Sequence, residues 1–316
     1  MKQRLEHLDV SKGILIILVV AAHIFQGSFV CKLAYNFHME AFFIISGLLI
    51  RHTAAETKPW KKLLPAKITA LLIPFCFFEL WGVARDLVLF GFQQNWKGFL
   101  YNTLTLNFNN GVLWFLFVLF FAELLFLAVL KLIRPGWAVA LVSVGSLFVS
   151  ILVPQGPQYL NYGLAILKTV FFLWVGYRFK DLLLKTNLPA VALAAAGLLT
   201  LVFTVGFVDY HAAALANLPF FLAGALCGTY LVLQAGKLPW LRWLSVVGQN
   251  TLIIYGTHSF YYVVFGRWIG ITDFLTAPLL LGLADFALVG AAEVPTVCLL
   301  NRFLPFLVGK RKKRKG

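Results

Sequence analysis

Three ionisable residues near the N-terminus combine types and spacing that could carry chemistry, within the stretch LDVSKGILIILVVAAHIF. Asp9 and Lys12 stand near its start, and His23 follows Lys12 along the same apolar run. Lys12 and His23 are separated by about three helical turns, a rise of about 16 Å, so they share one helix face. Asp9 lies within about 40° of that face. The spacing predicts one polar stripe with an acid and a base at its mouth and an imidazole near mid-membrane.

This stripe suits transfer of a group to a hydroxyl. A neutral imidazole can act as a general base toward a hydroxyl, and a lysine ammonium can hold a phosphate as a point charge. Ionisable groups within a membrane are costly and by default indicate a functional site. The structural alternative is that Lys12 reaches the membrane surface with its ammonium and that His23 hydrogen-bonds a neighbouring helix.

A second polar group occupies the segment NFHMEAFFIISGLLIR. His38 and Glu40 lie near one end of this segment and Arg51 lies at the other. Ser46 and Gly47 are small residues that let helices approach closely, and we expect them to serve packing. His38 and Glu40 enter the apolar zone and are therefore candidates for a site.

A third group occurs late in the chain, in VGQNTLIIYGTHSFYY. Thr251, Tyr255 and His258 follow i, i+4, i+7 spacing and share a helix face. His258 is expected at nearly the depth of His23. The structural alternative is a polar contact between Tyr255 and His258 that stabilises helix packing.

The composition places these residues in a membrane. Of the 316 residues, 61% are hydrophobic and 12% charged, whereas soluble domains average about half apolar and about a quarter charged. A spanning helix needs about 20 mostly apolar residues. We expect an all-α, polytopic membrane protein of about ten transmembrane helices, one domain over residues 1–309 with a basic tail at 310–316. The expected spans are 13–31, 34–50, 66–90, 112–132, 137–153, 161–178, 188–207, 213–234, 246–266 and 276–300.

The basic residues orient these spans. All but five of the 27 lysines and arginines lie at the N-terminus, in alternate loops or near the C-terminal run KRKKRK. This asymmetry is the positive-inside signal, so both termini are expected in the cytoplasm. The tail is expected to meet anionic lipid headgroups. Membrane lipids are therefore the expected partners of the basic residues that give the net charge of +15, and no nucleic-acid partner is expected.

The remaining polar residues within spans carry weaker signals. The four cysteines are isolated and no Cys/His cluster suggests zinc or iron, so no metal is expected. The asparagines between 91 and 111 could contact a sugar, although asparagine is also an ordinary loop residue. No spacing ties the other intramembrane charges to a site: Glu79, Glu123, Lys168, Asp285 and Glu293.

The order of these motifs resembles acyltransferase family 3, a family of multispanning membrane proteins. The stretches LDVSKGILIILVVAAH and FHMEAFFIISGLLI resemble the family's opening, in which a basic residue and a histidine are separated by ten residues, as Lys12 and His23 are. KKLLPAKITALLIPF resembles its basic stretch before the third span, and LWFLFVLFFAELL resembles its fourth span. GQNTLIIYGTH resembles its late Gly-x-x-Ser-x-x-x-Tyr-x-x-His element, which ends here at His258. The resemblance covers nearly the whole chain and looks nearest to the fucose O-acetylase-like branch.

The resemblance implies a function. Members are bacterial enzymes that move acyl groups, mostly acetyl, from a coenzyme A thioester to hydroxyls of carbohydrates. We therefore expect an O-acetyltransferase of the bacterial cytoplasmic (inner) membrane that uses acetyl-CoA and modifies a carbohydrate or glycolipid acceptor of the cell envelope. The expected residues are His23, His38 and His258 for catalysis, Lys12, Asp9, Arg51 and Lys67 for the coenzyme, and Glu40, Tyr255 and Thr251 for the acceptor.

Several positions depart from the family pattern. Lys12 replaces the frequent arginine and keeps the charge but not the bidentate fork. Glu40 stands where proline is common, and Thr251 where serine is usual. Many members carry an extracytoplasmic hydrolase-like domain that completes the transfer, whereas this sequence ends in KRKKRKG. Either the chain acts alone, or a separate extracytoplasmic transferase or an assembly partner supplies the second step.

Two other classes of function remain open from the sequence. A transporter or flippase for a lipid-linked sugar would also be polytopic with intramembrane histidines, although such folds often contain repeats, and none is visible. A structural membrane subunit is the third alternative, and the three histidine-bearing spans argue against it.

Overall fold

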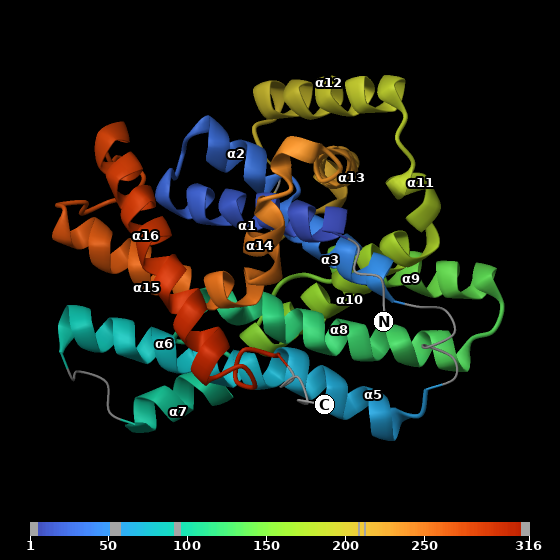
Figure 1. Ribbon diagram of the computed structural model, residues 1–316. Helices are drawn as coiled ribbons and strands as arrows, with labels where there is room; N and C mark the ends of the chain where they lie inside the picture. The colour runs from blue at the N-terminus through green and yellow to red at the C-terminus, as the bar shows by residue number, and fades with distance from the viewer. Residues whose placement is uncertain (1–5, 51–57, 92–95, 208, 212, 311–316) are drawn as a thin grey trace, which may run out of the picture. The chain divides into compact units, whose positions relative to one another are not determined.

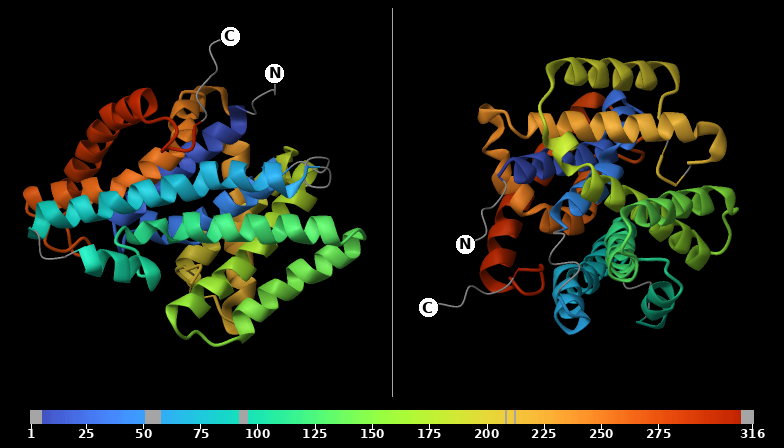
Figure 2. Two further views of the ribbon diagram at one scale, coloured as in Figure 1. Left: turned by 90° about the horizontal axis from the view of Figure 1, so that it is seen from below. Right: turned by 90° about the vertical axis from the view of Figure 1, so that its right-hand side faces the viewer.

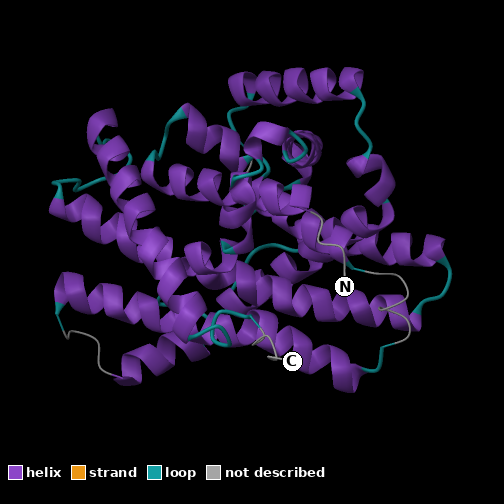
Figure 3. Ribbon diagram, viewed as in Figure 1, coloured by secondary structure: helices purple, strands orange, loops and turns teal. Residues whose placement is uncertain are grey.

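The computed structural model describes residues 6–50, 58–91, 96–207, 209–211 and 213–310. Within these ranges every regular element is a helix and no strand occurs (Figure 3), which confirms the all-α prediction. The helices are α1 (Glu6–Ile24), α2 (Phe29–Tyr35), α3 (His38–Leu49), α5 (Trp60–Lys67), the π-helix η1 (Ile68–Leu72), α6 (Ile73–Phe90), α7 (Trp96–Leu104), η2 (Gly111–Leu113), α8 (Trp114–Leu132), α9 (Gly136–Leu152), α10 (Gln158–Arg178), α11 (Lys180–Leu184), α12 (Leu188–Thr204), η3 (Leu215–Asn217), α13 (Leu218–Ala235), η4 (Pro239–Leu241), α14 (Leu244–Gln249), α15 (Thr251–Trp268) and α16 (Leu279–Phe303).

The chain forms two compact units, each assembled from separated stretches of sequence. The first unit contains Met1–Lys58, Ala122–Gln155 and Gly163–Thr251, and the second contains the remaining stretches. Within the first unit, α1 packs on α14 (Figure 1) and α12 runs alongside α13, as the right-hand view of Figure 2 shows. A single transmembrane domain over residues 1–309 stays a prediction, and the tail from residue 311 lies outside the described residues.

Several helices have the length and composition of membrane spans. Each predicted span overlaps at least one helix, although 34–50 and 246–266 are each divided between two helices. Six helices in the described residues are long and apolar enough to cross a bilayer. The protein is therefore a multi-pass membrane protein by its helices, while the count of ten spans and the cytoplasmic termini stay predictions. The six are Glu6–Ile24, Trp60–Leu89, Gly111–Leu132, Gln158–Arg178, Leu215–Ala235 and Leu279–Phe303.

The distribution of side chains on α16 also fits lipid surroundings. The buried face of α16 carries Asp285, Glu293 and Thr296, whereas its exposed positions include Leu280 and Val294, with 80% and 66% of their surface accessible. Polar side chains therefore point into the protein and apolar ones away from it. This is the arrangement expected of a helix whose outer surface meets hydrocarbon, because intramembrane ionisable groups face the protein interior.

The first helix differs from its predicted bounds. The sequence predicted a helix over residues 13–31, but α1 begins at Glu6 and ends at Ile24. Gly27 then adopts a φ of 72°, in the left-handed region that glycine tolerates, and the Ser28 side chain accepts a hydrogen bond from the Cys31 backbone N–H at the start of α2. The predicted start was wrong because hydropathy alone excludes the first two turns of α1, which contain several polar residues. In the structure most residues of these turns are buried within the first unit and belong to the helix.

The short helix α3 is buried along most of its length. Ten of its twelve residues are buried, and its length of about 18 Å is less than a bilayer core of about 30 Å. A Cβ on Gly47 would lie 2.2 Å from the Leu173 carbonyl oxygen, and one on Gly176 would lie 2.0 Å from that of Ile44. The backbones of α3 and α10 therefore touch at two glycines, which confirms the packing interpretation of Gly47.

Candidate functional site

The polar stripe begins with an ion pair in the first turns of α1. Lys12 Nζ lies 2.7 Å from Asp9 Oδ1. Asp9 is buried, whereas the Lys12 side chain keeps 24% of its surface exposed. An ammonium has three N–H donors, so its contact with Asp9 leaves capacity for an anionic ligand. The predicted contact between the two residues is present, and the binding of coenzyme by Lys12 stays a prediction.

Close backbone contact with α14 fixes the position of this ion pair. A Cβ on Gly248 would lie 1.7 Å from the Asp9 carbonyl oxygen, and one on Gly13 would lie 2.4 Å from that of Leu244. Neither position can accept a side chain without moving a backbone. Gly248 opens the late motif GQNTLIIYGTH, so the first residue of that motif packs directly behind the mouth of the stripe in the first unit.

His23 lies at the opposite end of α1, in its last turn, and is half-buried. The sequence placed it deep inside a longer helix, and this placement was wrong because the helix ends one residue later. The C-terminal end of a helix carries partial negative charge, which stabilises a nearby cation. An imidazole that takes a proton from a hydroxyl becomes such a cation, so this position suits a general base.

The first residue of α3, His38, is held in one tautomer. Its Nδ1 lies 2.7 Å from the Ala34 carbonyl oxygen, and its ring lies 5.1 Å from that of Tyr35 between centroids. Because a carbonyl oxygen only accepts hydrogen bonds, Nδ1 of the neutral ring donates and the lone pair is on Nε2. His38 is therefore oriented to accept a hydrogen bond or a proton through Nε2.

Glu40 is fully buried in the first turn of α3. Among the described residues, no hydrogen bond reaches either of its carboxyl oxygens, but the ammonium of Lys168 on α10 interacts with it electrostatically. Lys168 is itself 5% exposed and donates from Nζ to the Tyr210 carbonyl oxygen at 2.6 Å. A buried carboxyl group with hydrogen-bonding capacity, opposed by a buried cation, can accept a hydrogen bond from a hydroxyl of a ligand.

Tyr210 ties the loop before α13 to α10. Its hydroxyl donates to the Ala165 carbonyl oxygen at 2.6 Å and lies 2.8 Å from Thr169 Oγ1, so Thr169 is the donor in that second bond. Burial raises the pKa of the Tyr210 hydroxyl well above its ordinary value, which keeps the phenol protonated. The Lys168 ammonium also lies 4.7 Å from the Tyr210 ring centroid, within the range of a cation–π contact.

In the second unit, His258 is held in the same tautomer as His38. Its Nδ1 lies 3.0 Å from the Ile254 carbonyl oxygen and 2.9 Å from that of Tyr255. Nδ1 of the neutral ring is therefore the donor, and Nε2 carries the lone pair. The imidazole is fully buried and stacks on Tyr262 at 6.2 Å between ring centroids.

The two other polar residues of the late motif have intramolecular partners. Thr251 Oγ1 donates to the Gly248 carbonyl oxygen at 2.7 Å. The Tyr255 hydroxyl donates to the Val112 carbonyl oxygen, and the Tyr255 ring lies 5.9 Å from that of His258. These contacts support the structural alternative for Tyr255, because its hydroxyl proton is used within the second unit.

A buried network around Glu79 supports α15 beside His258. Glu79 Oε1 accepts from the backbone and side-chain N–H groups of Asn109, and Oε2 accepts from the Asn110 backbone at 3.2 Å. The Asn110 side chain donates to the Gly256 carbonyl oxygen at 2.9 Å and accepts from Ser259 Oγ at 2.8 Å. The side chains of Asn109 and Asn110 therefore position the helix, which favours the structural alternative over sugar contact for these two asparagines.

Lys67 ends α5, is half-buried and directly precedes the π-helix. At the end of this π-helix, the Ile73 N–H bonds to the Ile68 carbonyl oxygen in the wide i→i+5 pattern. The next residue, Pro74, has no backbone N–H to donate. Such π turns are frequent at functional sites. Arg51, the other predicted coenzyme contact, lies outside the described residues.

Comparison with known proteins gives one match, to a protein-family model. A family model described as an acyltransferase domain matches residues 5–297. The chain belongs to acyltransferase family 3. No curated protein and no solved structure matches it.

As a membrane acyltransferase, the protein divides its predicted site residues between the two units. The first holds Asp9 and Lys12 in contact, with His23, His38 and Glu40 on its helices, and Thr251 at its edge; the second holds Lys67, Tyr255 and His258. Convergence of all three histidines on one substrate stays a prediction. Within the described residues, no group of three or more His, Cys, Asp or Glu side chains could hold a metal ion.

Two charged residues of the acyltransferase received too little weight from the sequence alone. Lys168 and Glu79 were ranked as weak because no local spacing tied them to a site. Their partners lie far away in the sequence, at Glu40, Tyr210 and the 109–110 loop. The only available signal was that a charged residue stands in an apolar segment.

Proposed function

We propose that this acyltransferase moves an acetyl group from acetyl-CoA to a hydroxyl of a carbohydrate or glycolipid acceptor. The observation that carries the proposal is the Asp9–Lys12 ion pair on the same helix as His23, in a chain of the acyltransferase family. A cation for the donor's phosphates and an imidazole for the acceptor's proton thus share one rigid element. Rigid elements hold reacting groups more accurately than loops do.

Lys12 binds the coenzyme phosphates in this scheme, and Asp9 fixes its ammonium. Arg51 and Lys67 supply further positive charge. The separation of Lys12 and His23 by about 16 Å along α1 suits an extended coenzyme arm that brings the thioester toward the imidazole. Acetyl-CoA is the acyl donor and no metal takes part.

His23 acts as general base on the acceptor. Its imidazole takes the hydroxyl proton while the oxygen attacks the thioester carbonyl; the tetrahedral intermediate then expels the coenzyme thiolate, which takes the proton from the imidazolium. The products are the acetyl ester and free coenzyme A. In the alternative order the imidazole receives the acetyl group first and passes it to the acceptor. His38 and His258 contact the acceptor or polarise the carbonyl, depending on their protonation.

The acceptor is bound through hydrogen bonds. The buried Glu40 carboxyl group accepts from an acceptor hydroxyl, which its unused hydrogen-bonding capacity supports. Thr251 and the ring of Tyr255 complete the acceptor contacts.

Positive-inside asymmetry supports a protein of about ten spans with both termini in the cytoplasm. We place it in the bacterial cytoplasmic membrane, in the fucose O-acetylase-like branch, where it modifies a cell-envelope polysaccharide or its precursor. It acts alone or hands the group to a separate extracytoplasmic transferase.

The test is acceptor-dependent release of free coenzyme A by purified full-length protein given labelled acetyl-CoA and a panel of monosaccharides and lipid-linked sugars. Label should appear in the acceptor in equal amount. A transporter or flippase for a lipid-linked sugar, the alternative class, would release no coenzyme. Label that stays on the protein without acceptor would favour the acyl-imidazole order.

A further inference from the structure

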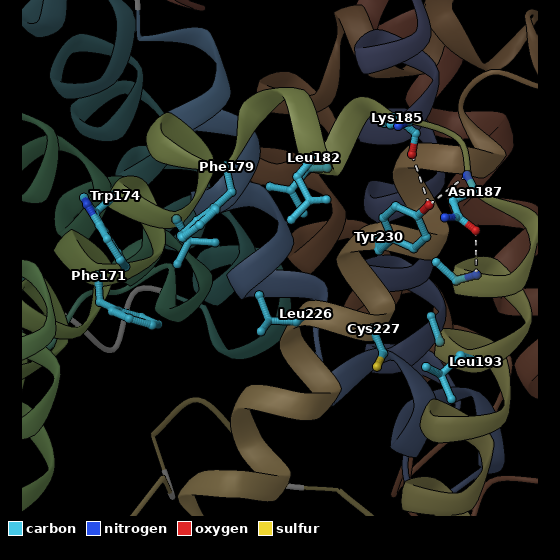
Figure 4. Close-up of a pocket in the computed structure, with 14 residues that line it drawn as sticks. Phe171, Trp174, Phe179, Leu182, Lys185, Asn187, Leu193, Leu226, Cys227 and Tyr230 are labelled. Carbon is cyan, nitrogen blue, oxygen red and sulfur yellow. Dashed lines mark hydrogen bonds between the residues drawn. The ribbon is translucent and has the colours of Figure 1, made fainter. Parts of the chain in front are cut away.

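The first unit contains an apolar pocket that the proposed reaction does not use. The pocket lies among α10, α11, α12 and α13 and has a volume of about 700 Å³, within the range of about 300–1,000 Å³ typical of small-ligand sites. Three aromatic side chains gather on one side, and the other side carries aliphatic side chains together with Cys227 and the ring of Tyr230 (Figure 4). The aromatic side consists of Phe171, Trp174 and Phe179.

One end of the pocket is a polar rim that the fold holds in place. The Tyr230 hydroxyl donates to the Lys185 carbonyl oxygen at 3.1 Å and accepts from the Asn187 backbone N–H at 3.2 Å (Figure 4). Asn187 Oδ1 in turn accepts from the Ala190 backbone N–H at the start of α12. The backbone that carries Lys185 is therefore fixed at this end of the pocket.

Positive charge gathers at this rim. Among the described residues, Lys185 is the only charged residue that lines the pocket. Residues 178–185 also contain Arg178, Lys180 and Asp181, so this segment carries a net positive charge. The N-terminal end of α12 adds partial positive charge at Asn187. An apolar cavity with a basic mouth between membrane helices is complementary to a lipid whose headgroup is anionic.

We propose that this pocket binds one acyl chain of an anionic phospholipid, with the lipid phosphate at Lys185. The aromatic and aliphatic walls match a hydrocarbon chain and offer few groups to a sugar. Lys185 and the α12 N-terminus select the negative headgroup. The site lies outside the residues assigned to the transfer reaction, and it makes the protein sensitive to the lipid composition of its membrane.

The experiment measures lipid retention on the purified full-length protein by native mass spectrometry, with phosphatidylglycerol and phosphatidylcholine of the same chains as probes. We expect one saturable phosphatidylglycerol per chain, bound about fivefold more tightly than phosphatidylcholine, because one lysine near a membrane surface contributes about that factor. Lys185→Gln should remove this preference. Leu226→Trp, which fills the pocket, should lower retention of both lipids at least about tenfold.

Two matched variants control for general effects on a membrane protein. Arg242→Gln removes the same charge from an exposed position away from the pocket, and Leu199→Trp enlarges an exposed α12 side chain that does not line it. Both should retain lipid like the unaltered protein. Equal retention of the two lipids, or an equal loss in Arg242→Gln and Lys185→Gln, would overturn the proposal. If Leu226→Trp does not fold, the charge variants and the comparison of the two lipids still decide it.

Discussion

The replacement Glu79→Gln tests the buried network that supports α15. The carboxylate accepts three hydrogen bonds, two from Asn109 and one from Asn110. Glutamine keeps one acceptor oxygen, and its NH2 group would face an N–H donor. One buried donor then loses its partner, at about 1–3 kcal/mol, and the remaining bonds lose their charge assistance. The free energy of unfolding should fall by roughly 2–4 kcal/mol.

The same change should reach the reaction through His258. Asn110 bonds to Gly256 and Ser259, which lie two residues before and one residue after the imidazole. A loosened 109–110 loop should therefore lower kcat per folded molecule as well as stability.

Unfolding in detergent micelles, followed by tryptophan fluorescence, would measure the stability of the full-length protein, and coenzyme release would measure kcat. Asp86→Asn is the matched control, because Asp86 lies on the same helix and its ion pair with Arg85 is partly exposed. Such a pair contributes about 0–1 kcal/mol. If Glu79→Gln unfolds within about 0.5 kcal/mol of Asp86→Asn, the network does not support the fold as argued.

Three further tests, two of them with a second replacement, address other parts of the structure. Gly248→Ala places a Cβ 1.7 Å from a backbone oxygen of α1 and should cost roughly 1–3 kcal/mol of unfolding free energy, whereas Gly145→Ala, where nothing lies within 4 Å, should stabilise α9 by about 0.5–1 kcal/mol. Lys12→Gln should raise the KM for acetyl-CoA about tenfold or more, and it should lower the unfolding free energy by about 1–3 kcal/mol because it removes the cation that contacts the buried Asp9 carboxylate. Lys168→Met should cost about 1–3 kcal/mol because the buried Tyr210 carbonyl oxygen loses this donor, and Glu40→Gln should change stability less in the Lys168→Met background than alone, because Lys168 and Glu40 interact electrostatically.

Each of these three has a result that would contradict it. Equal stability of the two glycine variants would mean that α1 and α14 do not touch as described. An unchanged KM in Lys12→Gln would leave the ion pair a purely structural role. If the effects of the two changes at Glu40 and Lys168 simply add, the two charges are not coupled.

The helices could be predicted from hydropathy, whereas some of their ends could not. All ten apolar runs chosen from the sequence overlap helices of the structure. Apolar runs predict helices because a helix satisfies its own backbone groups within lipid. The start of α1 was missed because Asp9 and its neighbours are polar, and their burial depends on glycines more than 200 positions later in the sequence. The end of α1 was signalled by Gly27 and Ser28, a helix stop followed by a cap.

Local spacing predicted the ion pair of the candidate site but not its longer-range partners. Asp9 and Lys12 are three residues apart, so one helical turn brings them together. Glu40 and Lys168, or Glu79 and Asn109, meet only through tertiary packing, and no periodicity in a single sequence encodes that contact. A charged residue in an apolar segment indicates that a partner exists, but the sequence does not show which residue that partner is.

The most direct measurement of the central claim compares acceptor-dependent coenzyme A release by the unaltered protein, by His23→Ala and by His211→Ala, a histidine at an exposed loop position. A general base contributes about 10²–10⁴-fold, so His23→Ala should lose at least about 100-fold in kcat while it unfolds like the unaltered protein. His211→Ala should keep its activity. Normal acetyl transfer by a folded His23→Ala protein would contradict the account.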